Sequence, residues 1–439
     1  MGTLSAGLEH RKLALWALLF LIANIGVKAS YAGSMLLLAT LLAPSEYASY
    51  GLLYALQSGA TTLAVIGLIE VTAGRLRNYG AETRHKLFQD ITGLFVYTAL
   101  VSCIFLLPIM FWLGGREGGL AVIPATLLGI ITGFSVMQAS FDRIDERHAV
   151  SLLTSAGIPL AAIVGVLFGT VLFGNLVAIY SLGLLGAAGV MLALGLSGKF
   201  YRITLPDRSA LRSASLEIVP FVAIGVLGWA SGYGMTLVVD TQFDPLAVAG
   251  FTFIYTAASV SQMVANSLNM VWAPRFYRLY NGGNHERAER QSGQFFAAMA
   301  LVLGITGFVV AVALPWVTWF VGGNLARYGL LHLELALLLS GYVLSTALWH
   351  CQNYFLVSGR GKEMMINSLW SGPVSLVLWV ICMLILGPLG AYVGFLLQIA
   401  IKAVLLWAAA RQHWTVRPWW PAIILCAALP FAALLVPVP

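Results

Sequence analysis

Positive charges inside long apolar runs are the residues of this chain best placed to do chemistry. Lys28 stands in the stretch ANIGVKASYAGS, residues 23–34. A lysine at the centre of a spanning helix is unfavourable by about 2.5–3.5 kcal/mol on insertion scales, so it needs water or a partner. Each end of the run is roughly 15 residues, or 22 Å, from Lys28, so the lysine side chain cannot reach the membrane surface. We expect Lys28 to face a cavity that holds an anionic group; an internal ion pair is the alternative.

Other polar residues sit beside such cations at helical spacing. Asn24 and Tyr31 share a helix face with Lys28 because they are four and three residues from it. A second cation, Lys402, follows Gln398 by four residues, although Lys402 is close enough to Arg411 for partial snorkelling to be an equal explanation. His350 would add a third positive charge when protonated, but a buried histidine with a purely structural role is the alternative.

Three polar stripes indicate where a hydrated interior would lie. Each has polar side chains at intervals of three and four, which places them on one face of a helix. The stripes are Thr252, Tyr255, Ser259, Gln262, Asn266 and Asn269; Tyr50, Tyr54, Gln57 and Thr61; and Thr346, His350 and Asn353. Hydrogen bonding between packed helices also requires such residues and is the alternative for the two shorter stripes. For the longest stripe we favour a cavity wall.

The composition predicts the elements that must position these residues. Of 439 residues, 60% are apolar and only 9% are charged, which is typical of an all-α polytopic membrane protein. Runs of about 20 apolar residues each suffice to cross a hydrocarbon core. We predict spans at 13–42, 48–75, 89–113, 120–141, 150–171, 176–197, 216–239, 246–274, 292–320, 333–358, 366–386 and 388–410. A short final run, 421–437, either crosses as a thirteenth span or lies against the other helices.

The distribution of basic residues predicts orientation. Of the 24 Lys and Arg residues, 20 fall in one alternating set of loops: 1–12, 75–88, 142–149, 198–215, 275–291, 359–365 and 411–420. Basic loops stay on the cytoplasmic side, so we expect an inner-membrane protein with a cytoplasmic N-terminus. This asymmetry accounts for most of the net charge of +7, and no nucleic-acid partner is needed to explain it. The four cysteines fall inside predicted spans, where packing is expected rather than a disulfide or a metal site.

An internal repeat indicates two halves. With an offset of 201 residues, Pro44 aligns with Pro245, Tyr54 with Tyr255, and Arg77 with Arg278, without a gap. We therefore predict two pseudo-symmetric six-helix lobes, 1–197 and 216–410, joined by a cytoplasmic linker, 198–215, and followed by 411–439. In transporters built from such repeats the substrate site lies at the interface of the repeats.

Several stretches resemble one family of membrane proteins. LLAPSEYASYGLLYAL (41–56), VVDTQFDPLAVAGFTFIYTAAS (238–259) and WAPRFYRLY (272–280) are similar to the polysaccharide flippases of the Wzx type, as are LPWVTWFVG (314–322) and YFLVSGRGKE (354–363). The likeness covers nearly the whole chain. It also extends to the wider superfamily, which includes multidrug exporters and the lipid II flippase. Ala48 and Thr241 depart from the pattern, which commonly has a glycine and a basic residue at these positions.

The resemblance implies a transporter that flips a polyprenyl-diphosphate-linked oligosaccharide across the membrane by alternating access. Phosphate oxygens accept strong hydrogen bonds from cations, and sugar hydroxyls suit amide, phenol and hydroxyl side chains. We expect a monomer surrounded by membrane lipids, without cofactor or metal, working beside glycan polymerases or glycosyltransferases. The expected substrate-binding residues are Lys28, Asn24, Tyr31, Tyr54, Gln57, Tyr255, Ser259, Gln262, Asn266, His350, Asn353, Gln398 and Lys402.

Two other functions fit parts of the sequence. A cation-coupled multidrug exporter of the same fold would need a mid-span carboxylate, and none of the mid-span positions is Asp or Glu. A membrane enzyme acting on lipid-linked sugars would need a catalytic base or paired carboxylates. The one dense cluster of acidic and basic residues, DRIDER at 142–147, lies in a short turn and is interpreted as solvated charge. We therefore do not expect an enzyme.

Overall fold

The regular structure of the chain is helical. The computed structural model describes residues 29–65, 67–69, 81–116, 118–201 and 224–437, together with single positions outside these ranges. Every regular element in those residues is a helix, in agreement with the predicted all-α class. The chain divides into two compact units: a first unit of residues 1–38 and 52–229, and a second unit of residues 39–51 and 230–439. The division falls within helix α2 (Pro44–Val65).

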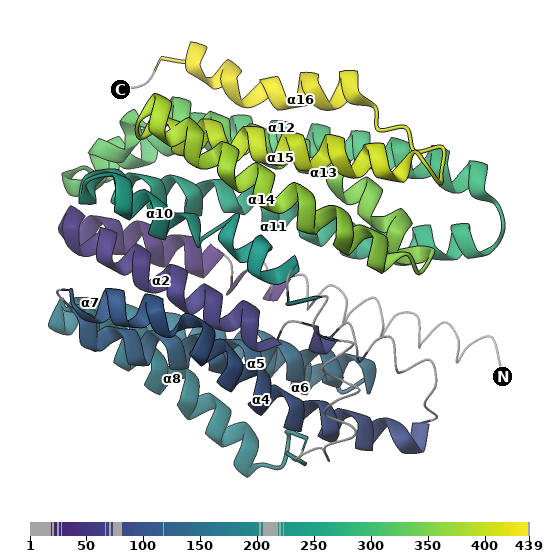
Figure 1. Ribbon diagram of the computed structural model, residues 1–439. Helices are drawn as coiled ribbons and strands as arrows, with labels where there is room; N and C mark the ends of the chain where they lie inside the picture. Colours follow the sequence, from purple (N-terminus) through teal and green to yellow (C-terminus); the bar gives the residue numbers. More distant parts are fainter. Residues whose placement is uncertain are drawn as a thin grey trace. The chain divides into compact units, whose positions relative to one another are not determined.

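The first unit is a bundle of long helices and short helical connections (Figure 1). Its elements after α2 are α4 (Ala81–Gly114), η2 (Gly119–Ala121), α5 (Val122–Ile144), α6 (His148–Leu152), the π-helical turn η3 (Leu153–Gly157), α7 (Ile158–Phe173) and α8 (Leu176–Leu196). Aromatic side chains form the centre of its core: the rings of Phe88 and Phe141 stack at 4.6 Å, and those of Phe95 and Phe134 meet edge to face at 5.4 Å.

The second unit is a bundle of the same kind (Figure 1). Its elements are α10 (Met235–Gln242), α11 (Pro245–Asn281), α12 (His285–Val321), η4 (Gly323–Leu330), α13 (His332–Val357), α14 (Gly361–Leu386), α15 (Leu389–Ala410), α16 (Trp420–Ala432) and η5 (Ala433–Leu435). Residues 39–51 join it through specific contacts. The amide of Asn324 donates to the carbonyl of Leu42 at 3.2 Å, and the ring of Tyr47 lies 6.1 Å from that of Tyr328.

Most of the predicted membrane spans are confirmed. In the described part of the chain, nine helical segments are long and apolar enough to cross a membrane, and they correspond to the third to sixth and eighth to twelfth predicted spans. Large apolar side chains are exposed on them, such as Phe111 on α4 and Trp370 on α14. Exposed faces of this kind are normal where the surrounding solvent is lipid. The protein is therefore an integral membrane protein.

The helices that begin at the two repeated prolines confirm that part of the internal repeat. α2 begins at Pro44 and α11 begins at Pro245. Proline suits the first turn of a helix because amide protons there have no partner within the helix, so its missing N–H costs no hydrogen bond. An acidic side chain supports each start. The carboxylate of Glu46 accepts from the amide of Ala43, and that of Asp244 accepts from the amide of Ala247, both at 2.9 Å. The aligned prolines therefore mark equivalent helix starts.

The seventh predicted span, 216–239, is interrupted in the part of it that the structure describes. Residues 224–230 are helical, residues 231–234 form a turn, and α10 then begins at Met235. Across this break the backbone bonds are of the i to i+3 type, as in the 3.0 Å bond from the amide of Met235 to the carbonyl of Gly232. Gly234, at the end of the turn, has φ −60° and ψ −26°, so the break is a tightened helical turn rather than a reversal of the backbone.

The final apolar run lies against other helices of its unit. The apolar helix Trp420–Leu435 is shorter than the nine long segments, at about 24 Å for a rise of 1.5 Å per residue. α16 packs along α12 and α13 and is drawn in yellow in Figure 1. The hydroxyl of Ser340 on α13 donates to the carbonyl of Ala427 at 2.7 Å. The run is packed against its neighbours, and its crossing of the membrane as a thirteenth span stays a prediction.

Glycines permit the closest helix contacts of the first unit. Along α7, a Cβ added at Gly165 would collide with the backbone of Leu182 on α8, and one at Gly169 would come within 2.7 Å of the Cα of Ile179. Close approach of this kind brings backbones into van der Waals contact, which drives helix association where lipid removes the hydrophobic effect.

We expect Gly165→Ala to destabilise the protein by about 1–3 kcal/mol, because the added methyl must push α7 and α8 apart. Gly189→Ala on α8 is the matched control, since a Cβ there meets nothing within 4 Å. Thermal unfolding in detergent would measure both. Equal melting temperatures for the two variants would contradict close backbone packing at Gly165.

Candidate functional site

The break in the seventh span is held by two polar side chains of α15. The ammonium of Lys402 donates to the hydroxyl of Ser231 at 2.7 Å, and the amide of Gln398 donates to the carbonyl of the same Ser231 at 3.1 Å. The carbonyl of Ser231 follows helix residues 224–230, so it lies where a helix leaves its last carbonyls without internal partners. A cation beside such carbonyls also complements the negative end of the helix dipole.

Lys402 does not snorkel toward the nearer end of α15 in this arrangement. It lies about 12 Å from that end, given a rise of 1.5 Å per residue, and its ammonium instead bonds Ser231 within the bundle. Within the described part of the chain, no carboxylate forms an ion pair with it. One neutral hydroxyl leaves two of its three N–H donors for other groups. The pair can therefore still bind an anionic oxygen.

Gln398 adds an acceptor to the same place. Its side chain is fully buried, and its amide oxygen has no hydrogen-bond partner among the described residues. Buried amide oxygens are normally satisfied, and an unmet one is a place where a ligand or water can donate. Lys402 and Gln398 thus offer charged donors and a neutral acceptor about one helical turn apart, which suits a ligand that carries both phosphate and hydroxyl groups.

Aromatic side chains line the same region. The ring of Tyr233, from the turn that breaks the seventh span, meets the ring of Tyr255 on α11 edge to face at 4.9 Å. Phe395, one turn before Gln398 on α15, meets Tyr255 edge to face at 5.9 Å. The break, α11 and α15 therefore converge on one cluster in which Lys402, Ser231 and Gln398 are the polar members.

The polar stripe of α11 divides into parts with different environments. The side chain of Thr252 packs against Gly51 of α2, so closely that a Cβ added to Gly51 would overlap it. The hydroxyl of Ser259 donates to the carbonyl of Thr256 at 2.7 Å. Gln262 is exposed. Asn269 accepts from the amide of Asn353 at 3.0 Å. The side chain of Asn266 lies outside the described residues. Packing thus accounts for Thr252, Ser259 and Asn269, and only Gln262 is exposed in the described part of the stripe.

His350 lies inside a layer of aromatic rings. It is buried on α13, stacks on Phe296 at 5.1 Å and on Tyr354 at 5.7 Å, and its two ring nitrogens have no hydrogen-bond partner among the described residues. Asn353, one turn along, is also buried and bonds Asn269 across to α11. The bond of Asn353 to Asn269 fits the structural alternative for the shorter stripe. The two unmet nitrogens of His350 are satisfied by neither explanation, and its role stays a prediction.

The candidate residues of the first unit are described in part. The ring of Tyr31 lies 5.1 Å from that of Tyr54 on α2, so these two predicted site residues are brought together. Gln57, one turn further, has a half-buried side chain, and its carbonyl accepts from Thr61 at 3.0 Å. Asn24 and Lys28 lie outside the described residues, and their role stays a prediction.

Sequence reasoning missed Ser231 and Tyr233. Neither belongs to a polar stripe, because the stripes were sought at regular helical spacing and these residues lie where the helix is interrupted. The signal that could have found them is the pair of glycines in SGYG, residues 231–234. In a spanning segment, two glycines around one aromatic residue indicate a break, and breaks in transporter helices commonly form binding sites.

The charged cluster DRIDER is only partly solvated. Arg143 and Glu146 are exposed, as the interpretation as solvated charge requires, but that interpretation is wrong for Asp142, which is buried. The side chain of Asp142 is fully buried and pairs with Arg147 at 3.3 Å. Arg147 also donates to the carbonyl of Lys199. The phenol of Tyr201 donates to Asp145 at 2.6 Å, and Arg84 of α4 lies 3.9 Å from the same carboxylate. These contacts tie α4 and α5 to the segment that follows α8.

Burial and the hydrogen bond to Asp145 raise the pKa of the Tyr201 phenol above its ordinary value. The ring of Tyr201 also packs against the rings of Phe88 and Phe141. The guanidinium carbon of Arg147 lies 5.3 Å from the centre of the Tyr201 ring. The network is therefore continuous with the aromatic core of the first unit. Asp145 accepts a hydrogen bond from Tyr201, whereas Asp142 has only the ion-pair contact with Arg147, and its oxygens accept no hydrogen bond from the described residues. Contacts between three segments of one unit indicate a structural role.

Comparison of the fold with solved structures gives consistent neighbours. A multidrug resistance MATE family transporter of the MOP superfamily, inward-facing, matches with a TM-score of 0.59 and 18% identity over 90% of this chain and 97% of that chain. An outward-facing structure with the same description gives 0.57 and 17% over 90% and 94%. The eukaryotic MATE transporter AtDTX14 gives 0.63 and 15% over 96% and 99%. No protein-family model and no curated protein matches the sequence. At these identities the likeness establishes a MATE-like fold with two lobes.

We expect Arg147→Gln to destabilise the protein, because it leaves the carboxylate of Asp142 buried without its ion pair. The cost should be up to about 3 kcal/mol, at the low end for a broken buried pair because the Arg147 side chain is 31% exposed. Arg290→Gln is the control: it removes an exposed pair with Glu286 and should change stability by less than about 0.5 kcal/mol. Thermal unfolding of both variants, and of Asp142→Asn/Arg147→Gln, measures the difference. A double variant that recovers none of the loss would contradict the pairing.

Proposed function

We propose that this protein is a transporter that moves an anionic, lipid-linked oligosaccharide from the inner to the outer leaflet of the cytoplasmic membrane. The proposal rests chiefly on Lys402, a cation inside a spanning helix whose ammonium bonds only a neutral hydroxyl among the described residues. The diphosphate of a polyprenyl-diphosphate head group would be an anionic partner for this ammonium. Lys28, at the centre of the first predicted span, would supply a second such charge.

The sugar part of the substrate fits the neutral polar groups. The free oxygen of Gln398 can accept from a sugar hydroxyl, and the half-buried ring of Tyr233 can pack against a sugar ring. The apolar polyprenyl tail would stay in the lipid, which is the medium that already covers the exposed apolar faces of the spans. No step of this transport requires a covalent bond to form or break, so the protein is proposed to act without catalysis.

Alternating access is the proposed mechanism. The MATE transporters that share this fold have been solved in inward-facing and in outward-facing conformations. The carbonyl of Ser231 already accepts from a side chain of α15, so this interrupted span is proposed to change its local geometry at lower cost than an intact helix. The turn at residues 231–234, bonded by Gln398 and Lys402, is therefore the proposed point at which substrate binding and conformational change meet.

Multidrug export is the second candidate, and the fold likeness favours it, because the neighbours are described as multidrug resistance transporters. The charges of this chain favour the first candidate. In the described helices, acidic side chains such as Asp90, Asp142 and Glu289 lie in the first or last third of their helix, whereas Lys402 lies further inside. A cationic drug would be repelled by Lys402 and would find no mid-span carboxylate in that part of the chain.

We expect Lys402→Ala to lower flipping of a fluorescent polyprenyl-diphosphate oligosaccharide in proteoliposomes by about tenfold or more at limiting substrate, since one charge-assisted hydrogen bond is lost. Lys402→Arg should retain part of the activity because it retains the charge. Lys362→Ala, which removes an exposed lysine at the start of α14, is the matched control and should flip at the native rate.

The outcomes separate the two candidates. Flipping by Lys402→Ala at the native rate would remove Lys402 from the substrate site. If the native protein flips no lipid-linked oligosaccharide but accumulates a cationic dye against a proton or sodium gradient, multidrug export replaces the proposed function. Equal unfolding temperatures of native protein and variants, measured beforehand, ensure that a lost signal reflects transport rather than folding.

A further inference from the structure

A basic pocket lies at the connection between α15 and α16, beyond the end of the helix that carries Lys402. Its volume is about 660 Å³, and it is lined by residues 411–418 together with Trp407. The connection is a compact turn: the amide of Trp414 bonds the carbonyl of Ala410 at 3.0 Å, and the indole of Trp407 donates to the carbonyl of Val416 at 3.1 Å. The pocket is therefore bounded by backbone that is bonded at both ends.

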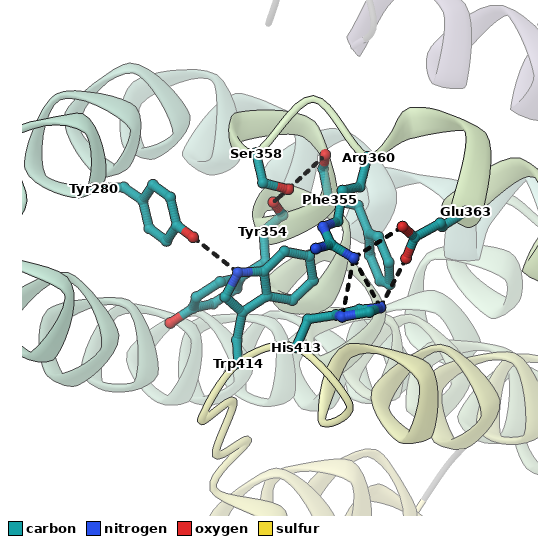
Figure 2. Close-up of polar contacts among 8 residues, drawn as sticks. All are labelled: Tyr280, Tyr354, Phe355, Ser358, Arg360, Glu363, His413 and Trp414. Atoms are coloured by element: carbon teal, nitrogen blue, oxygen red, sulfur yellow. Dashed lines mark hydrogen bonds and ion pairs between the residues drawn. The ribbon is translucent and has the colours of Figure 1, made fainter.

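The wall of the pocket formed by His413 and Trp414 is fixed by a network that also engages the carboxylate of Glu363 (Figure 2). The indole of Trp414 donates to the phenol of Tyr280 at 2.8 Å. Glu363 is paired with Arg360 at 2.9 Å and with His413 at 2.8 Å. This carboxylate is already engaged by two basic groups, so it does not cancel the remaining arginines of the pocket.

Those arginines are Arg411 and Arg417. Arg411 is exposed, and its guanidinium lies 4.8 Å from the ring of Trp407. It forms no ion pair with any acidic residue in the described part of the chain. Arg417 is 80% exposed and reaches Glu289 only at 4.0 Å. Two planar donor groups therefore line one polar pocket with little carboxylate to neutralise them, which is a favourable arrangement for a phosphate.

The flanking helices place this pocket at the level of lipid head groups. Val404 and Leu405 near the end of α15 are exposed apolar residues, as are Ile424 and Leu425 on α16. Trp419, between the pocket and α16, is also exposed. Tryptophans concentrate where hydrocarbon gives way to head groups, and basic residues beside a spanning helix attract anionic lipids on the cytoplasmic side.

We infer that this pocket binds the head group of an anionic membrane phospholipid, with Arg411 and Arg417 bonding its phosphate and Trp407 facing its glycerol backbone. The ligand is a lipid rather than a soluble anion, because exposed apolar faces adjoin the pocket on both helices and can take up the acyl chains. The site is independent of the transported cargo, and its test below requires no transport.

The test is native mass spectrometry of the detergent-solubilised full chain, titrated with phosphatidylglycerol and, separately, with phosphatidylcholine. We expect the native protein to retain the anionic lipid and to bind the zwitterionic one more weakly. Arg411→Gln/Arg417→Gln should weaken phosphatidylglycerol binding by about 25-fold, or about fivefold for each arginine, and leave phosphatidylcholine binding unchanged. Arg287→Gln/Arg290→Gln removes two charges from the start of α12 outside the pocket and should bind within about twofold of native.

Two results would overturn the inference. One is native-like phosphatidylglycerol binding by Arg411→Gln/Arg417→Gln. The other is an equal loss in the α12 control, which would mean general attraction to positive charge rather than a site. Arg417→Gln alone guards against misfolding, because its side chain is largely exposed, and about fivefold weaker binding is expected from it. Displacement of the lipid by millimolar glycerol phosphate would overturn the assignment of a lipid ligand and indicate a site for a soluble anion.

Discussion

The hydrocarbon core offers no hydrogen bonds, so each polar group within it must find a partner in the protein, and this constraint explains the most informative feature of the second unit. The seventh span breaks at Ser231, and a break in lipid would leave backbone groups unsatisfied. Gln398 meets the carbonyl of Ser231, and Lys402 meets its hydroxyl. An irregular backbone is thus tolerated because α15 supplies the polar groups that lipid does not, and those groups then become available to a ligand.

The two units bury charge in different ways, and this difference distinguishes ion pairs with a structural role from a charge that can bind a ligand. In the first unit, Asp142 faces Arg147, and Asp145 faces Tyr201 and Arg84, so each buried charge has a partner of its own. In the second unit, Lys402 has a neutral partner. A matched pair is satisfied without a ligand, whereas an unmatched ammonium gains free energy when an anion arrives. This asymmetry, rather than the number of polar residues, carries the functional argument.

The two proposed anion sites of the second unit lie along α15 and at its end. Lys402 lies inside the bundle, and Arg411 follows the last residue of the helix, where the chain turns toward α16. Lys402 and Arg411 have different surroundings. Lys402 is beside a broken helix and aromatic rings, while Arg411 is beside tryptophans and a polar turn. One lies where a transported head group would be bound, and the other where a lipid of the membrane itself would be.

The sequence by itself determined the elements. Lengths of apolar runs predicted the nine long spans, and the alignment of Pro44 with Pro245 predicted equivalent helix starts, because these signals are local and lipid imposes one secondary structure on them. It also placed Gln398 and Lys402 on one face. Only the tertiary structure decided what those faces meet: Ser231 beside Lys402, aromatic rings around His350, and Arg147 beside a buried Asp142. Periodicity fixes the direction of a side chain about its own helix, but the neighbouring helix, which carries no signal at that spacing, decides its partner.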